Sequence, residues 1–297
     1  MEVEPRGEAR PPTAERGDPL GGTCDAVYLS PHIDDAVLSC GGTIRRRSRR
    51  GQRILVVTVC AGVPEDGGAL SPYAERLHRR WGSAAGSASL SAVQAVQRRL
   101  GEDRAALSRL GATGVWLDVP DAIYRRDPAT GRWPYDRTAA LFRRVHRSDG
   151  SVAADLAARL AELPALAAAT EVIVPLSVGH HVDHQLVRTA AELWRDPADL
   201  RYYEDYPYAE DDAAVATALA RPQGWRSARQ RLAVTDMTAK VEAVACYASQ
   251  MSTFWPDLEA MRTAVCAFSR RQGGGRPAER TWRRRAPPRA RRMSAPG

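Results

Sequence analysis

The residues best suited to chemistry are one histidine and two aspartates that directly follow a short apolar run. His32, Asp34 and Asp35 lie within four positions, after the apolar residues 26–29. Charged groups at the end of a buried strand are costly unless they are paired or bind a metal. A histidine and an aspartate suit a divalent metal ion, and a second aspartate beside them suits a general base. This segment therefore predicts a metal site with an adjacent proton acceptor.

A second cluster of the same kind follows another apolar run. Residues 179–184 read Gly-His-His-Val-Asp-His and come after residues 171–176, and four of the six histidines fall in the two clusters. A single His-x-x-Asp pair is more often a solvated turn or the capped start of a helix. Two clusters at the ends of two predicted strands favour one site assembled from both. The other histidines, His78 and His146, lie in arginine-rich stretches and are interpreted as surface residues.

The composition is typical of a globular protein without a membrane span. Hydrophobic residues make up 44% of the 297 positions, which is enough for a sizeable core. The chain has no run of 18 apolar residues, and residues 1–22 lack the apolar centre of a signal peptide. The five cysteines show no CxxC spacing, which fits reduced thiols better than a disulfide framework. We therefore expect a cytoplasmic protein.

The net charge of +8 is concentrated near the C-terminus. Residues 270–292 hold ten arginines and one glutamate, a charge of +9, which leaves −1 for the rest. We expect a disordered segment at residues 1–23, one domain at residues 24–269, and a basic disordered tail at residues 270–297. Lys240 is the only lysine, so the excess of arginine points to a coding bias. Nucleic-acid binding is therefore not predicted as the primary function.

The residues between the two tails alternate between strand and helix signals. Apolar and β-branched runs predict five strands, at residues 25–30, 53–60, 115–119, 171–176 and 200–203. Helical spacing predicts helices at residues 36–50, 73–81, 90–110, 151–169 and 184–195. This alternation favours a Rossmann-like α/β fold, with a mostly parallel sheet flanked by helices. Ligands bind at the carboxyl ends of such strands, where both clusters are placed. No GxGxxG segment follows the first strand, which argues against a nicotinamide cofactor.

The two clusters resemble the paired motifs of a known enzyme family. PHIDDAVLSCGG, residues 31–42, looks like the PHPDD motif of the LmbE-like, or PIG-L, deacetylases, and GHHVDH looks like their HPDH motif. Ile33 and Val182 stand where the family usually has proline. Known members are zinc-dependent N-deacetylases that act on N-acetylglucosamine-containing molecules. The resemblance implies the LmbE-like deacetylase fold and this type of activity.

The resemblance also implies which residues bind the metal. His32, Asp35 and His184 match the positions that hold Zn²⁺, and such a set leaves an open position for water, as catalytic zinc sites do. A His/His/Asp set also accepts Fe²⁺ or Co²⁺. Asp34 matches the general base that takes a proton from water.

Two further positions of the second motif carry implied roles. His181 matches the residue that stabilises the oxyanion or protonates the leaving amine, whereas His180 is interpreted as a packing residue or a backbone contact. Asp183 is placed to hydrogen-bond a histidine ring and to fix its tautomer.

Substrate contacts are harder to read from the sequence. Four side chains are candidates: Arg98, Arg99, Asp121 and Tyr203. Either arginine has an equally simple alternative as a surface ion pair with Glu102 or Asp103. Asp121 has an alternative as a helix cap, and Tyr203 as a core residue.

We therefore expect a metal-dependent hydrolase that removes an acetyl group from an N-acetylated amino sugar within a small-molecule conjugate. One alternative keeps the metal site but hydrolyses the amide of a thiol-sugar conjugate. An alternative from another class is a non-catalytic protein that binds a metal or, through its basic tail, a polyanion. The sequence predicts no oligomeric state.

Overall fold

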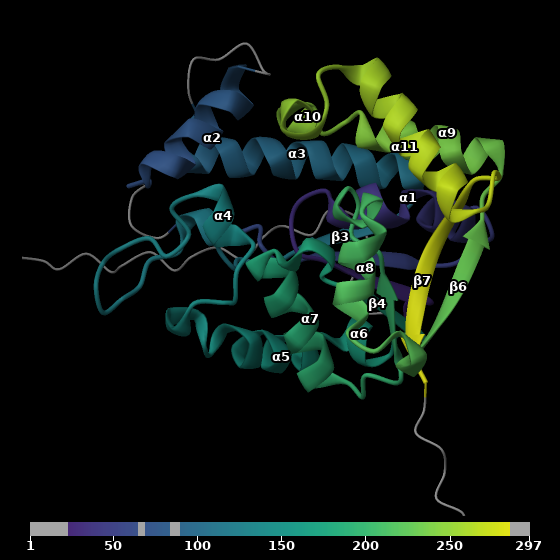
Figure 1. The fold of residues 1–297 in the computed structure, drawn as a ribbon, viewed down its shortest axis with the longest axis horizontal. Coiled ribbons are helices and arrows are strands. Elements are labelled where there is room, and N and C mark those ends of the chain that lie inside the picture. The colour runs from purple at the N-terminus through teal and green to yellow at the C-terminus, as the bar shows by residue number, and fades with distance from the viewer. Residues whose placement is uncertain (1–22, 65–68, 84–89, 286–297) are drawn as a thin grey trace, which may run out of the picture.

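A seven-stranded sheet runs through the middle of the computed structural model, which describes residues 23–64, 69–83 and 90–285 (Figure 1). The strand order is β3-β2-β1-β4-β5-β7-β6. The strands are β1 (Ala26–Ser30), β2 (Ile54–Thr58), β3 (Thr113–Trp116), β4 (Glu171–Pro175), β5 (Leu200–Tyr203), β6 (Trp225–Arg231) and β7 (Ala278–Arg284).

The five predicted strands are confirmed as β1 to β5, and they pair in parallel. Every residue of β1 and β2 is buried, as in the centre of a sheet that helices cover on both faces. The predicted Rossmann-like α/β fold is therefore confirmed. β1 and β4 are neighbours, so the segments that follow them lie side by side at the carboxyl edge of the sheet.

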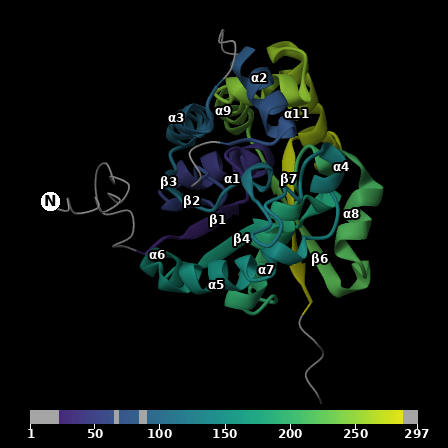
Figure 2. The ribbon, with the colours of Figure 1, turned by 90° about the vertical axis from the view of Figure 1, so that its left-hand side faces the viewer.

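Helices form a layer on each face of the sheet (Figure 2). They are α1 (Asp35–Ser48), α2 (Pro72–Ser83), α3 (Ala92–Leu110), α4 (Thr138–Leu141), α5 (Val152–Glu162), α6 (Pro164–Ala167), α7 (Val182–Trp194), α8 (Asp212–Leu219), α9 (Val234–Val244), α10 (Ala248–Phe254) and α11 (Leu258–Gln272). On one face α1, α3 and α9 pack together, and on the other face α5 packs against α7.

The local signals of these helices explain where they begin and end. Ser91 and Gln94 form a capping box at the start of α3, and Gly111 ends that helix with a left-handed φ of 71°. The prediction of one continuous helix at residues 151–169 is wrong. The segment is divided into α5 and α6 because Pro164, which lacks an amide hydrogen, starts a new helix at its first position.

The prediction of a disordered basic tail from residue 270 onward is wrong. α11 continues to Gln272, and β7 pairs antiparallel with β5 and β6. In β7, Glu279 accepts a hydrogen bond from Lys240 Nζ at 2.7 Å and from the amide of Thr43 at 2.7 Å. The folded domain therefore extends to Arg285, the last residue that the structure describes before residues 286–297.

The arginines of β7 explain why composition misled the prediction. Three of them pair with glutamates of the domain: Arg280 with Glu204, Arg283 with Glu171 and Arg284 with Glu192. These positive charges stabilise the attachment of a strand and do not form a solvated arm.

The predicted N-terminal segment, apart from Thr23, lies outside the described residues.

The interpretation of His78 as a surface residue is also wrong, because the residue is buried. Its Nε2 lies 2.8 Å from the hydroxyl of Tyr124, and its Nδ1 lies 3.0 Å from the carbonyl oxygen of Leu90. The ring is therefore part of a small core that joins α2 to the loop after β3.

Among the described residues, no helix has the length and apolar character needed to cross a membrane.

Candidate metal centre

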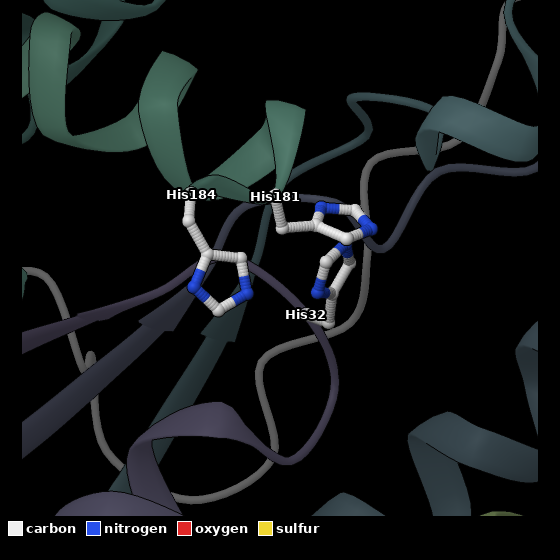
Figure 3. Close-up of side chains that lie close together, drawn as sticks. All are labelled: His32, His181 and His184. Carbon is white, nitrogen blue, oxygen red and sulfur yellow. The ribbon is translucent and has the colours of Figure 1, made fainter. Parts of the chain in front are cut away.

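The two histidine clusters meet at the carboxyl ends of β1 and β4. His32 lies in the turn after β1, and Asp34 and Asp35 form the N-cap and the first residue of α1. His181 and His184 lie at the start of α7, after β4. Figure 3 shows the three imidazoles pointing toward one another from these separate segments. The predicted convergence of distant loops is present in the structure.

Three imidazoles and one carboxylate lie close together. Ligand atoms of His32, His181 and His184 all lie within 4.8 Å of one another. Oδ2 of Asp35 lies 3.1 Å from Nδ1 of His32 and 3.3 Å from Nε2 of His184. The structure therefore brings the predicted ligands His32, Asp35 and His184 together and adds His181 to the same cluster.

The second nitrogen of each ligand ring lies against a carboxylate. Nε2 of His32 lies 2.9 Å from Oδ2 of Asp183, and Nδ1 of His184 lies 2.7 Å from Oδ1 of Asp205. When these nitrogens carry the ring protons, the neutral rings direct lone pairs from His32 Nδ1 and His184 Nε2 toward Asp35. Such carboxylate–histidine pairs are typical of metal sites.

The acceptor atoms Nδ1 of His32, Nε2 of His184 and Oδ2 of Asp35 lie close enough to repel one another unless a positive charge lies between them. Nε2 of His184 is fully buried and has no hydrogen-bond partner. Although burial disfavours charge on the ring, Asp35 and Asp205 raise the pKa of His184 to about 9. Burial likewise opposes ionisation of Asp35, yet His184 and His32 hold its pKa below its usual value. The donor set therefore fits a divalent cation both in chemistry and in electrostatics.

Asp34 lies beside this set and is engaged differently. Burial and the neighbouring Asp35 carboxylate raise the pKa of Asp34 to about 8 in the absence of an ion. Its backbone has φ 155° and ψ −30°, an unusual conformation for a residue other than glycine. Such strain occurs at functional sites, where the surroundings hold a side chain in place. The side chain makes no cap hydrogen bond to α1.

His181 is oriented by the helix that it begins. Its Nδ1 accepts a hydrogen bond of 3.3 Å from the amide of Asp183. Burial and the nearby His32 lower the pKa of His181 well below its usual value, so the ring is neutral at pH 7. A neutral ring that accepts at Nδ1 carries its proton on Nε2. His181 therefore offers a hydrogen-bond donor, which suits an oxyanion or a leaving amine.

Two charged residues that the sequence analysis did not assign complete the site. Nη2 of Arg125 lies 2.6 Å from Oδ1 of Asp183, an ion pair whose angles are outside those of a hydrogen bond. Although burial opposes it, this arginine keeps the pKa of Asp183 well below its usual value. Asp205 also accepts a hydrogen bond from the amide of Val178 at 2.9 Å. The only signal for Asp205 is its place two residues after the end of β5.

The candidate substrate residues separate into two groups. Arg99 is buried, and its Nη1 lies 3.7 Å from Oδ2 of Asp121, which in turn lies 4.0 Å from Nε2 of His32. Asp121 also caps a short 3-10 helix, so it fills the alternative role as well. Arg98 is instead half-buried and pairs with Glu102 at 3.8 Å, which is the alternative expected for it.

Tyr203 and His180 do not lie at the centre. Tyr203 is fully buried in β5 and donates a hydrogen bond of 3.1 Å to the carbonyl oxygen of Leu29, so no substrate can reach it. Its assignment as a substrate residue is corrected. His180 is exposed, and its carbonyl oxygen accepts a hydrogen bond from Gln185, in line with the backbone role expected for it.

Comparison with known proteins identifies the family. The model of the PIG-L family, described as GlcNAc-PI de-N-acetylase, matches residues 27–194, which include both histidine clusters. The chain belongs to the PIG-L family. Its similarity to a curated relative, the 2'-N-acetylparomamine deacetylase of Niallia circulans, is 29% identity over 232 residues, 76% of this chain and 80% of the relative.

Solved structures of this PIG-L protein's relatives extend the likeness to the fold. The zinc-inhibited form of teicoplanin deacetylase has a TM-score of 0.71 and 29% identity, covering 86% of this chain and 96% of the relative. The deacetylase of the A40926 pseudoaglycone has a TM-score of 0.66 and 28% identity, covering 90% of this chain and 100% of the relative. The LmbE-like α/β fold expected from the motifs is thus confirmed.

Proposed function

We propose that this chain is a metal-dependent N-deacetylase, and that it removes the acetyl group of an N-acetylated amino sugar within a glycoconjugate. The observation that carries this proposal is that the Asp35 carboxylate lies within 3.1 Å of His32 and 3.3 Å of His184, with the carboxyl group of Asp34 close to Asp35. The relatives support the substrate class, because their names describe deacetylases of paromamine, teicoplanin and A40926 pseudoaglycone compounds.

His32, Asp35 and His184 would hold the metal, and we propose Zn²⁺ as the resident ion. The orphaned Nε2 of His184 and the two oriented imidazole lone pairs fit this ion. A divalent ion bound there supplies a Lewis acid for the acetyl carbonyl and lowers the pKa of water to about 7. Fe²⁺ and Co²⁺ accept the same donor set and are the competing ions.

The remaining side chains would handle protons and developing charge. Asp34 takes the proton of the attacking water, whose oxygen forms the new bond to the carbonyl carbon. The Nε2–H of His181 donates to the carbonyl oxygen as it gains negative charge. The C–N bond then breaks, and the sugar nitrogen leaves as an amine after receiving a proton from Asp34 or His181.

Asp183, Arg125 and Asp205 would act by position and not by contact with the substrate. Asp183 holds the ring of His32, and Asp205 holds that of His184. Arg99 and Asp121 are proposed to bind the sugar, since both lie next to the ligand set. The catalytic unit is proposed to span residues 24–285, from the start of the sheet to the end of β7.

The deciding experiment combines a metal analysis with an assay of acetate release. Purified protein is analysed for zinc, iron and cobalt, and acetate is measured with 2'-N-acetylparomamine and with N-acetylated glycopeptides. D34N is expected to lower kcat by about 10²–10⁴-fold and to keep the metal. H184A is expected to lose both the bound metal and the release of acetate.

The matched control is D118N, which changes an aspartate whose side chain is 83% exposed, and it should leave the rate unchanged. Absence of bound metal in the wild type, or full activity of D34N, would contradict the proposal. Loss of metal in D34N with retention in D35N would exchange the roles of the two aspartates.

A further inference from the structure

A cavity with a volume of about 220 Å³ lies near the amino end of β4, whereas the metal centre lies at the carboxyl end of this strand. Four arginines line it: Arg46, Arg47, Arg50 and Arg201. Glu171, the first residue of β4, also lines it, whereas the metal centre follows the last residues of β1 and β4. Helix α1 rises about 16 Å between Asp35 and Arg46. The cavity is therefore separate from the candidate catalytic site.

One carboxylate in this cavity faces three guanidinium groups. Arg47 Nη1 lies 2.6 Å from Glu171 Oε2, Arg283 Nη2 lies 2.9 Å from Oε1, and Arg201 pairs with the same carboxylate. Burial alone would raise the pKa of Glu171, but the neighbouring Arg201 and Arg47 lower it, so the group is ionised at neutral pH. A single negative charge leaves two of the three positive charges without compensation.

Two further arginines increase this imbalance. Arg46 and Arg50 form no ion pair with any carboxylate in the part of the chain that the structure describes. The Nε of Arg46 is fully buried and lacks a hydrogen-bond partner. A buried donor without an acceptor costs free energy, and clustered like charges repel one another. An anion that accepts hydrogen bonds would therefore be stabilised in this cavity.

The walls also supply neutral hydrogen-bonding groups. Thr43 and Thr281 contribute hydroxyls, and Gln230 contributes an amide. Tyr28 and Cys40, both buried, also line the cavity. Most of the other lining residues are half-buried, and Arg50 is exposed. A recess of this size admits a compact group more readily than a polymer chain.

We propose that this cavity is a second binding site for a compact dianionic oxyanion of the phosphate class, either free phosphate or the phosphomonoester group of a sugar phosphate. Guanidinium groups match phosphate oxygens with pairs of hydrogen bonds, and several of them around one cavity favour a tetrahedral anion over a planar carboxylate. Phosphate bound there would link α1 to β5, because Arg46 and Arg47 come from α1 and Arg201 comes from β5.

The test measures the binding of inorganic phosphate and of glucose 6-phosphate to the full-length protein by calorimetry, at constant ionic strength. Saturable binding of one equivalent is expected. R46Q/R50Q, which keeps the approximate length of both side chains, should weaken binding at least tenfold. The matched control R132A/R221A removes two exposed arginines elsewhere and should bind as the wild type does. Tighter binding of the sugar phosphate identifies a phosphomonoester as the ligand, and equal binding identifies free phosphate.

Two results would overturn this inference. One is the absence of saturable binding of either probe, and the other is an unchanged affinity in R46Q/R50Q. H184A separates this site from the metal centre, because the variant should keep its phosphate affinity even where it loses metal and activity. Loss of phosphate binding in H184A would place the anion at the metal centre instead. Melting temperatures with and without phosphate confirm that R46Q/R50Q is folded and show whether the ligand stabilises it.

Discussion

Nδ1 of His184 lies 2.7 Å from Oδ1 of Asp205, a carboxylate that is itself buried at the end of β5. This contact assigns the ring proton to Nδ1 and leaves Nε2 directed at Asp35. A residue 21 positions away in the chain therefore determines which atom of His184 faces the candidate metal. Because Asp205 also accepts a hydrogen bond from the amide of Val178, both of its oxygens are fixed.

We predict that D205N weakens zinc binding by about 10–100-fold. The amide keeps the shape of the carboxylate but loses the charge that favours a proton on Nδ1 of His184. Zinc affinity is measured by competition with a chromophoric chelator. D212N, which changes an exposed aspartate at the first position of α8, serves as the control and should bind zinc as the wild type does. Unchanged affinity in D205N would show that Asp205 has no part in orienting the ligand.

Arg125 gives a prediction that separates stability from metal binding. R125M leaves Asp183 buried without its charge partner, which is expected to lower the free energy of unfolding by about 3–5 kcal/mol. R125M/D183N removes both charges and should recover most of that loss. The double variant should still bind zinc weakly, because Nε2 of His32 loses the carboxylate that lies 2.9 Å from it. Urea denaturation and zinc titration give the two quantities, and zinc binding at the wild-type level in the double variant would contradict the role of Asp183.

The parts of the site that were predictable share one property, namely that they are close in sequence. His32, Asp34 and Asp35 stand within four positions at the end of an apolar run, and the cluster that ends at His184 repeats this arrangement. Arg125 and Asp205 lie in loops, each beside another charged residue. Nothing local distinguishes an aspartate that holds a histidine from one that caps a turn, so these two required the structure.

The incorrect predictions have a related cause. Tyr203 is adjacent to a candidate site in sequence, but its hydroxyl donates to a carbonyl of the neighbouring strand inside the core. β7 contains mostly polar and charged residues, and its stability depends on glutamates such as Glu204 and Glu171 far away in the chain. β1, β2 and β4 were predictable because their apolar runs report burial directly, whereas charge complementarity between distant segments leaves no local pattern.

The end of the folded domain provides a third prediction. A chain that ends at Ser269 lacks β7 and leaves the ammonium group of Lys240 buried without Glu279, which alone costs about 3–5 kcal/mol. We expect it to unfold at much lower urea concentration than the wild type, or not to fold cooperatively. A chain that ends at Arg285 retains β7 and should unfold as the full-length protein does. Equal stability of the two truncated chains would restore the earlier boundary at residue 269.

His78 makes the stability of the α2 region depend on pH. Burial lowers the pKa of His78 below its usual 6.5. The hydrogen-bond partners of the ring are the carbonyl oxygen of Leu90 and the hydroxyl of Tyr124, and the charged groups around it are Glu75, Arg99 and Asp121. Below pH 6.5 the unfolded chain binds a proton at this ring that the folded chain rejects. The contribution of neutral His78 to stability is therefore complete above pH 6.5 and decreases as the pH falls toward the lowered pKa.

H78Q isolates this contribution, because glutamine keeps a donor and an acceptor but does not titrate. We expect the difference in unfolding free energy between the wild type and H78Q to be largest at pH 7.5 and to shrink by pH 5.5. The comparison cancels the titration of the other histidines, since both proteins contain them. Urea denaturation at a series of pH values gives the difference directly. A difference that stays constant from pH 7.5 to pH 5.5 would mean that the folded protein accepts a proton at His78 as readily as the unfolded chain does.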